Sequence, residues 1–147
     1  NEQLAALLEP SGIKVASVPA THTFDTKTLQ AGWSHRSAAF VAGLGRFGLN
    51  RMLIGPAGGA GRYGTAFLSV ELPPSPKYDE DHCLYLKSGQ CRACARDCPV
   101  GALTENGYDR HLCYQHLLKI SADLGYADGS LDVCGKCDVA GPCALIK

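Results

Sequence analysis

The first 82 residues of this 147-residue chain contain no cysteine. All eight cysteines lie between Cys83 and Cys143. Disulfides stabilise many small secreted proteins, but a sizeable cysteine-free part would not need them, and no apolar signal segment is visible in the sequence. We therefore expect the thiols to ligate metal in a reducing compartment, the cytoplasm. Four disulfides are the alternative.

Long apolar runs and an excess of charge are also missing. No stretch approaches the roughly 18 apolar residues that a membrane span requires, although 46% of the chain is hydrophobic and can form a core. The chain has 14 basic and 14 acidic residues, so it lacks the positive excess of a nucleic-acid-binding protein. We expect a soluble protein whose partners include neither a membrane nor a nucleic acid.

Local patterns predict both helices and strands, which is an α+β composition. The predicted helices are residues 2–8, residues 34–42 with Ser34 as N-cap and Gly43 as terminator, and a helix that begins after Asp109 and ends at Gly125. The predicted strands lie at residues 13–18, 51–54 and 65–72. The last two are joined by a glycine-rich segment that forms either a hairpin or an extended loop.

A group of prolines divides the sequence into two parts. Pro73, Pro74 and Pro76 follow the last predicted strand of the glycine-rich part, and the composition becomes cysteine-rich directly afterwards. We place a domain boundary here, with an α/β segment at residues 1–76 and a cysteine-bearing domain at residues 77–147.

The cysteines form two groups of four by their spacing. The first is Cys83-x7-Cys91-x2-Cys94-x3-Cys98-Pro99 and the second is Cys113-x20-Cys134-x2-Cys137-x5-Cys143. Bacterial proteins with two [4Fe-4S] clusters use a C-x2-C-x2-C-x3-C-P run, in which the fourth cysteine ligates the other cluster. The first group matches this run except at its first position, where Ser88 replaces the expected cysteine. We assign the role of this first ligand to Cys83, five residues upstream.

Crossed ligation assigns every cysteine to one of two clusters. One cluster would use Cys83, Cys91, Cys94 and Cys143, and the other would use Cys98, Cys113, Cys134 and Cys137. The gap before Cys143 is x5 rather than x3, and no proline follows it. Two Zn(Cys)4 sites are the rival interpretation, because paired C-x2-C knuckles also hold zinc. Two iron–sulfur clusters in one small fold would relay single electrons.

A glycine motif lies upstream of the cysteines. Gly43-x-Gly45-x-x-Gly48 matches the dinucleotide fingerprint, but a helix is predicted before it and a strand after it, which reverses the required order. An NAD site is therefore not expected. The glycines either let the main chain approach a ligand or only turn the chain. Arg46 and Arg62 beside them are either ligands for an anion or ordinary surface residues.

These features together resemble the epoxyqueuosine reductase family and its relatives, which include corrinoid reductive dehalogenases. The resemblance rests on the WSHR segment Trp33 to Arg36, the AGLGRFGLNRMLI run Ala42 to Ile54, the C-x2-C-x3-CP motif and the RHLCYQHL segment around Cys113. It covers about residues 34–147 and is nearest to the short relatives from anaerobes. It also implies that the N-terminal part of the cofactor domain is missing from this chain.

The resemblance implies a partial nitroreductase-like α/β segment that binds cobalamin, followed by a two-cluster bacterial ferredoxin-like domain. In that arrangement the glycine motif would approach the corrinoid. The family's acidic proton donor lies upstream of the glycines, and Asp25 is the only carboxylate in a comparable place. His35 is a second catalytic candidate, because it lies next to the motif in the sequence.

We therefore expect an iron–sulfur oxidoreductase or its electron-supplying part, with a redox partner protein or electron donor and a small-molecule substrate. The zero net charge disfavours a tRNA substrate. A stand-alone ferredoxin-like electron carrier is the alternative, and a zinc-stabilised binding module is a third possibility.

Overall fold

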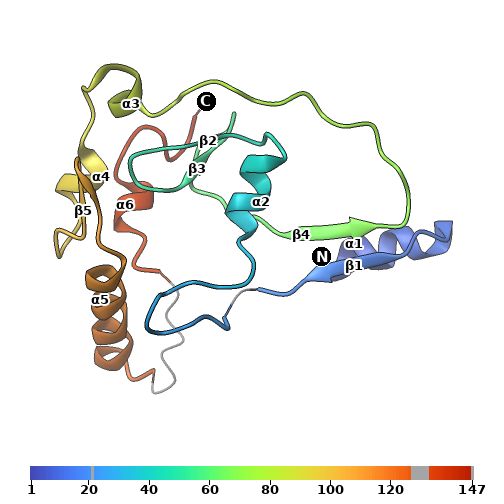
Figure 1. The fold of residues 1–147 in the computed structure, drawn as a ribbon, viewed down its shortest axis with the longest axis horizontal. Helices are drawn as coiled ribbons and strands as arrows, with labels where there is room; N and C mark the ends of the chain where they lie inside the picture. Colours follow the sequence, from blue (N-terminus) through green and yellow to red (C-terminus); the bar gives the residue numbers. More distant parts are fainter. Residues whose placement is uncertain (21, 127–132, 147) are drawn as a thin grey trace.

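The structure, a computed structural model, describes residues 1–20, 22–126 and 133–146, and its elements are labelled in Figure 1. The α-helices in these ranges are α1 (Glu2–Leu8), α2 (His35–Val41), α3 (Leu84–Ser88), α4 (Ala93–Arg96), α5 (Arg110–Asp123) and α6 (Lys136–Val139), and a 3₁₀ helix, η1 (Glu9–Ser11), follows α1. The strands are β1 (Val15–Val18), β2 (Arg46–Phe47), β3 (Leu53–Ile54), β4 (Thr65–Leu68), β5 (Leu103–Thr104) and β6 (Gly107–Tyr108). This mixture of helices and small antiparallel sheets confirms the α+β composition.

Capping residues explain where two of the helices begin and end. The Ser34 side chain accepts a hydrogen bond from the Ser37 N–H at 3.2 Å, and Asp109 Oδ1 accepts one from the Leu112 N–H at 2.9 Å. Gly43 and Gly125, just beyond α2 and α5, have φ angles of 77° and 78°, which glycine adopts without strain. The predicted caps and terminators of both helices are therefore confirmed. Among the described residues, no helix is both long and apolar enough to cross a membrane.

The strands form three separate antiparallel pairs, β1 with β4, β2 with β3, and β5 with β6. In the first pair Val15 lies opposite Leu68 and Val18 lies opposite Thr65. Of the two alternatives for the glycine-rich segment, the hairpin is wrong and the extended loop is right, because β3 pairs back to β2 and β4 pairs to β1. The two-residue strand β2 was not predicted, since so short an element has no visible periodicity.

The core contains residues from both sides of the predicted domain boundary. Its buried centre is Leu49, Ile54 and Cys83, and Tyr85, Cys94, Ala95, Cys143 and Ile146 pack against it. Residues 69–83, all of them described, connect β4 to α3 without helix or strand, and the boundary after residue 76 falls within this connection. The cysteine-free part thus contributes directly to the surroundings of the cysteines.

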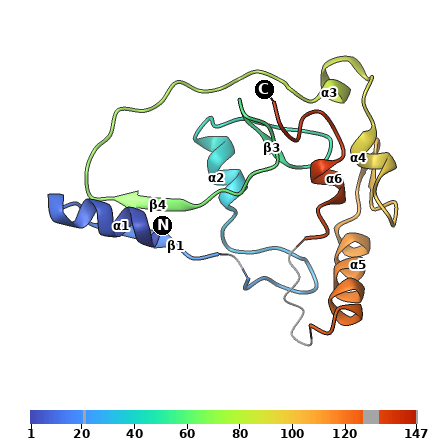
Figure 2. The same ribbon diagram turned by 180° about the vertical axis from the view of Figure 1, so that it is seen from behind.

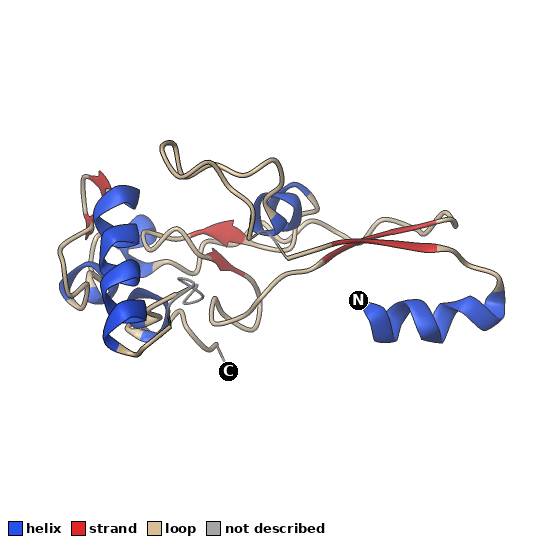
Figure 3. Ribbon diagram, turned by 90° about the horizontal axis from the view of Figure 1, so that it is seen from below, coloured by secondary structure: helices blue, strands red, loops and turns tan. Residues whose placement is uncertain are grey.

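The ribbon views show how the elements are distributed. In Figure 3, α1 and the β1–β4 ribbon extend from one end of the molecule, and α5 lies at the other end. The C-terminal segment after α6 lies beside the residues that follow β3, since the Gly59 N–H donates to the Cys143 carbonyl and the Ile146 N–H to the Ala57 carbonyl, and Figures 1 and 2 show this segment from opposite sides. None of the residues of α1 is buried, so this helix contributes little to the core.

We expect Leu53→Ala to lower the free energy of unfolding by about 2–5 kcal/mol, because the substitution leaves a cavity in the core. Leu53 is 1% exposed, whereas Leu7 in α1 is 73% exposed. Leu7→Ala removes the same atoms and should change the free energy of unfolding by less than about 0.5 kcal/mol. Denaturant unfolding followed by circular dichroism measures both, and equal losses would contradict this placement of the core.

Candidate metal centres

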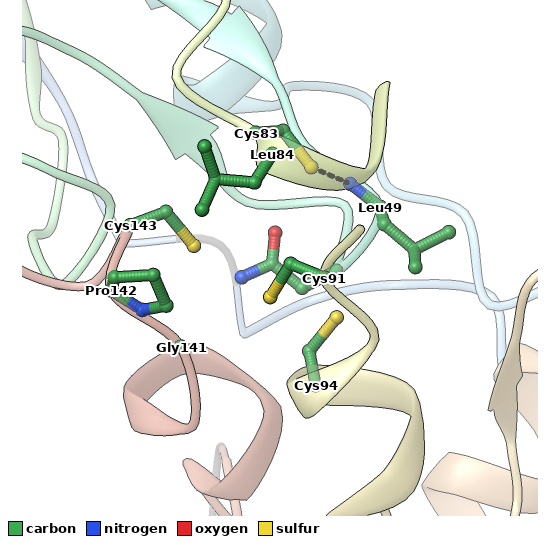
Figure 4. Close-up of a pocket in the computed structure, with 9 residues that line it drawn as sticks. Leu49, Cys83, Leu84, Cys91, Cys94, Gly141, Pro142 and Cys143 are labelled. Atoms are coloured by element: carbon green, nitrogen blue, oxygen red, sulfur yellow. Dashed lines mark hydrogen bonds between the residues drawn. The ribbon is translucent and has the colours of Figure 1, made fainter. Parts of the chain in front are cut away.

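Four cysteines from separate segments line one cavity. Cys83 is the N-cap of α3, Cys91 lies between α3 and α4, Cys94 lies in α4, and Cys143 belongs to the C-terminal segment after α6. Figure 4 shows their sulfur atoms turned toward a common space, and the remaining lining residues are Leu49, Asn50, Leu84, Gly141 and Pro142. These are the four cysteines that crossed ligation assigns to one cluster.

The main chain around this cavity leaves room between the sulfurs. A Cβ atom added at Gly141 would lie 3.5 Å from Cys143 Sγ and 3.9 Å from Cys91 Sγ, so any larger residue would fill part of that room. On the opposite side, the Leu49 N–H donates a hydrogen bond to Cys83 Sγ with an N to S distance of 3.4 Å. Amide donors to sulfur are typical of iron–sulfur sites, where they stabilise negative charge on the ligands. The residues present therefore fit a cluster held by thiolates.

The thiols of this group also act on one another electrostatically. Burial raises the pKa of Cys94, and the three other thiols of the group raise it further. Burial likewise raises the pKa of Cys143, and its neighbours Cys83 and Cys91 add to the effect. Ionising such a group is unfavourable without a nearby cation, because burial disfavours the charged thiolate and the thiolates also repel one another. A bound metal centre would remove this penalty.

The glycine-rich segment holds Cys143 in place. The Gly59 N–H donates to the Cys143 carbonyl at 2.8 Å, the Ala60 N–H donates to the Ala144 carbonyl at 2.9 Å, and the Ile146 N–H donates to the Ala57 carbonyl at 3.1 Å. A Cβ atom at Gly58, whose φ is 109°, would lie only 2.4 Å from the Ala144 oxygen. These glycines therefore let two stretches of main chain approach each other, and this contact positions the last cysteine of the sequence.

The other four cysteines lie around α5 and α6. Cys98 follows α4, Cys113 lies in the first half of α5, Cys134 precedes α6, and Cys137 lies within it. Burial raises the pKa of Cys137 to about 11, and the charges of the three other thiols of this group contribute to the shift. The structure thus brings these four thiols within electrostatic reach of one another.

Main-chain amides surround the sulfur of Cys98. Burial alone would raise the pKa of this thiol, but hydrogen bonds from the N–H groups of residues 100–103 outweigh it, and the pKa is lowered. Pro99 has no N–H, and Gly101 has a φ of 66°, which suits the tight turn that directs the amides toward the sulfur. The C-P-V-G-A-L segment therefore stabilises the thiolate form of Cys98.

Tyr108, Asn50 and Asp138 lie beside the four cysteines around α5 and α6. Burial raises the pKa of Tyr108, and a hydrogen bond with Cys113 raises it further. The Asn50 side chain donates from Nδ2 to the Cys137 carbonyl at 3.2 Å. Burial raises the pKa of Asp138, although the positive charges of Arg36 and Arg62 act in the opposite direction. The second group is thus bordered by polar side chains from both parts of the chain.

Within the described residues, no group of three or more His, Cys, Asp or Glu side chains is arranged to hold a single metal ion. Around one zinc ion, with Zn–S bonds of about 2.3 Å, tetrahedral geometry separates the sulfurs by about 3.8 Å. A [4Fe-4S] cluster is larger than one ion and needs its ligands further apart. All eight cysteines are free thiols in the structure.

The two catalytic candidates predicted from the sequence make local structural contacts. Asp25 Oδ1 accepts hydrogen bonds from the N–H groups of Thr28 at 2.7 Å and Lys27 at 2.8 Å, and these bonds lower the pKa of Asp25. A proton donor at neutral pH needs a raised pKa instead. His35 Nδ1 lies 2.9 Å from Thr65 Oγ1 and Nε2 lies 3.1 Å from the Pro19 oxygen, so both ring nitrogens join α2 to the β1–β4 ribbon.

The glycine motif likewise fits tight contacts within the chain. A Cβ atom at Gly43 would lie 2.6 Å from Lys77 Cγ, and one at Gly45 would lie 2.3 Å from the Ile54 oxygen. A Cβ atom at Gly48 would lie 2.6 Å from Ile54 Cδ1. Of the two interpretations of these glycines, the structure favours the one in which they serve the path of the chain.

The arginines beside the motif have partners within the chain. Arg46 pairs with Asp79 and, at 3.3 Å, with Asp81, and these acidic neighbours raise the pKa of Arg46. The positive charge of Arg62 acts on Asp138 and partly offsets the increase in pKa that burial causes. Arg46 therefore attaches the segment before α3 to β2.

Several contributors to the two sites were not found by sequence reasoning. Leu49 and Asn50 belong to the AGLGRFGLNRMLI run, but they reach the cysteines only through tertiary contacts, which the run does not indicate. Gly141 was visible as a glycine two residues before Cys143, and the amides after Pro99 follow from the C-P motif.

In comparisons with protein-family models, curated proteins and solved structures, nothing matches this chain. The resemblance to the epoxyqueuosine reductase family therefore stays a prediction.

We expect Asp25→Ala to destabilise the protein at neutral pH, because the carboxylate accepts two main-chain hydrogen bonds in the folded state. The folded-state pKa is lowered, so this contribution is complete above the unfolded pKa of about 4 and is lost as the pH falls through the folded value. Unfolding curves of parent and variant should therefore converge in acid. Asp25→Asn keeps an acceptor oxygen and should lose less stability at neutral pH. A difference that persists in strong acid would contradict this role.

Proposed function

We propose that this protein is an iron–sulfur electron carrier, or the electron-supplying part of a reductase, that binds two [4Fe-4S] clusters. The observation that supports this most strongly is the grouping of its thiols. The cysteines that the crossed spacing assigns to one cluster also line one cavity, and those assigned to the other influence one another's ionisation. A [4Fe-4S] cluster supplies one-electron redox chemistry when bound.

The chain's own groups would adjust the properties of each site. The Leu49 N–H on Cys83 and the amides of residues 100–103 on Cys98 stabilise negative charge on the ligating sulfurs. Such hydrogen bonds favour the more negative, reduced state and raise the reduction potential. Cys83 is only 7% exposed, which limits the access of water to that ligand.

The short helix α4 connects the two sites. It carries Cys94 of one proposed cluster and leads directly to Cys98, which crossed ligation assigns to the other. Four residues of α-helix advance the chain by about 6 Å, so the two ligand sets are neighbours. This closeness suits electron transfer between two centres, and a ferredoxin-like arrangement of residues 77–147 is part of the proposal.

The reductase part of the proposal rests on the resemblance alone. The contacts of Gly43, Gly45 and Gly48 lie within the chain, and the carboxylate of Asp25 belongs to a turn. The described residues thus support electron relay more directly than they support a corrinoid site.

Anaerobically purified protein should be brown and contain about eight iron and eight sulfide atoms per chain, with EPR signals from two reduced clusters. Iron and sulfide assays together with EPR spectroscopy measure this. Colourless protein with about two zinc ions per chain, or protein whose thiols are oxidised to disulfides, would overturn the proposal.

Two double variants test the grouping of the ligands. Cys91→Ala with Cys143→Ala removes two thiols from one cavity, so one intact cluster of about four iron atoms should remain. Cys91→Ala with Cys113→Ala removes one thiol from each group, so both native EPR signals should disappear. Since each variant loses two cysteines, equal spectra from the two would contradict the crossed assignment.

Addition of cobalamin to the cluster-loaded protein distinguishes a carrier from a corrinoid reductase. We expect no change in the absorption spectrum of the corrinoid, because the glycine motif is occupied by contacts within the chain. A saturable spectral change would instead support the corrinoid-binding interpretation.

A further inference from the structure

The turn between β2 and β3, residues 48–52, contacts both cysteine groups. From the main chain, the Leu49 N–H donates to Cys83 Sγ at 3.4 Å. From the side chain, Asn50 Nδ2 donates to the Cys137 carbonyl at 3.2 Å. Leu49 and Asn50 also line the cavity that contains Cys83. One short turn from the cysteine-free part therefore reaches a ligand of each proposed cluster.

Asn50 is a buried polar residue whose contacts explain its presence. It is 6% exposed, and its Oδ1 accepts a hydrogen bond from the Met52 N–H at 3.1 Å while its Nδ2 donates to Cys137. A leucine of similar size would fill the space without the cost of burying an amide. Asn50 therefore bonds both to the main chain of its own turn, at Met52, and to the main chain at Cys137. A change in the conformation of the turn would move its contact with Cys137.

Contacts from other elements hold the turn in one conformation. Arg36 Nη1 donates to the Arg51 carbonyl and to Met52 Sδ, each at 3.0 Å. The Arg51 N–H donates to the Gly48 carbonyl at 3.0 Å, which helps to keep Arg51 at a φ of 61°, a value that L-residues adopt rarely. Hydrogen bonds from Arg36 of α2 therefore hold the turn in place independently of its contacts with the cysteines.

Gly48 allows this close approach. A Cβ atom at Gly48 would lie 3.0 Å from Asn50 Oδ1, 3.6 Å from Cys83 Cβ and 2.6 Å from Ile54 Cδ1. A side chain at this position would push the turn away from both Asn50 and Cys83. The geometry of the turn thus depends on a glycine that adjoins Leu49 and Asn50.

We infer that the turn of residues 48–52 couples the two cluster sites, with Leu49 adjusting the centre at Cys83 through its N–H and Asn50 acting as a positioning residue for the centre at Cys137. This inference rests on the proposed function, since it requires both clusters to be bound. It assigns a redox role to residues that carry no thiol.

The first test compares Asn50→Leu with Ser121→Ala in the cluster-loaded protein. Both variants remove a buried side-chain hydrogen bond to a main-chain carbonyl, because Ser121 Oγ donates to the Tyr126 oxygen at 3.2 Å. Asn50→Leu also removes the bond that Oδ1 accepts from the Met52 N–H. We expect both to keep about eight iron atoms per chain. Only Asn50→Leu should shift the midpoint potential of one cluster and alter the magnetic interaction between the two reduced clusters, as measured by EPR-monitored redox titration.

The second test uses a matched pair of glycine variants and does not remove any hydrogen-bonding side chain. Gly48→Ala should make the potential of the cluster at Cys83 more negative, because the Leu49 N–H moves away from the sulfur. A Cβ atom at Gly32 would meet nothing within 4 Å, so Gly32→Ala should leave both potentials unchanged.

The outcomes separate this inference from the proposed function. Parent protein without iron or EPR signals would overturn the proposed function. Parent protein with two clusters, together with unshifted potentials and unchanged magnetic interaction in both Asn50→Leu and Gly48→Ala, would overturn the role of the turn alone. Loss of stability in Asn50→Leu equal to that in Ser121→Ala, with no redox effect, would indicate a purely structural contact.

Discussion

The cost of ionising thiols that are buried close to one another is the constraint on which the rest of this structure depends. Burial and the charges of nearby sulfurs raise the pKa of Cys94, Cys137 and Cys143, so the free energy of the folded chain rises when these groups ionise without a cation. The same side chains belong to the core, because Cys83, Cys94 and Cys143 pack with Leu49 and Ile54. The candidate site and the core therefore share residues, so binding of a metal centre at these cysteines would be coupled to folding.

Glycine makes this arrangement possible in the cysteine-free part. Gly58 and Gly59 let the glycine-rich segment bond to the main chain at Cys143 and Ala144, and Gly48 lets the turn after β2 reach Cys83. Both contacts bring main-chain donors or acceptors close to Cys83 and Cys143. These three glycines thus have a physical explanation in contacts within the chain.

The sequence predicted helix ends correctly where one local hydrogen bond decides where the helix begins. The caps at Ser34 and Asp109 were predictable because a side chain satisfies an amide within three residues, and the helices begin where the caps predict. The pairing of β4 with β1 and the strand β2 were not predictable. Their partners are chosen by contacts between distant residues, and the short strands carry little periodicity of their own.

The sequence by itself determined the number of thiols, their spacing in two groups of four and the proline after Cys98, because the order of the residues alone fixes these features. Only the tertiary structure decided what surrounds those sulfurs. Leu49, Asn50 and the segment around Gly59 reach them across large separations in the chain, through hydrogen bonds that no local pattern encodes. The tertiary structure also placed Asp25 and His35 in turns and junctions, since their hydrogen-bonding atoms are satisfied by neighbouring main chain and by Thr65.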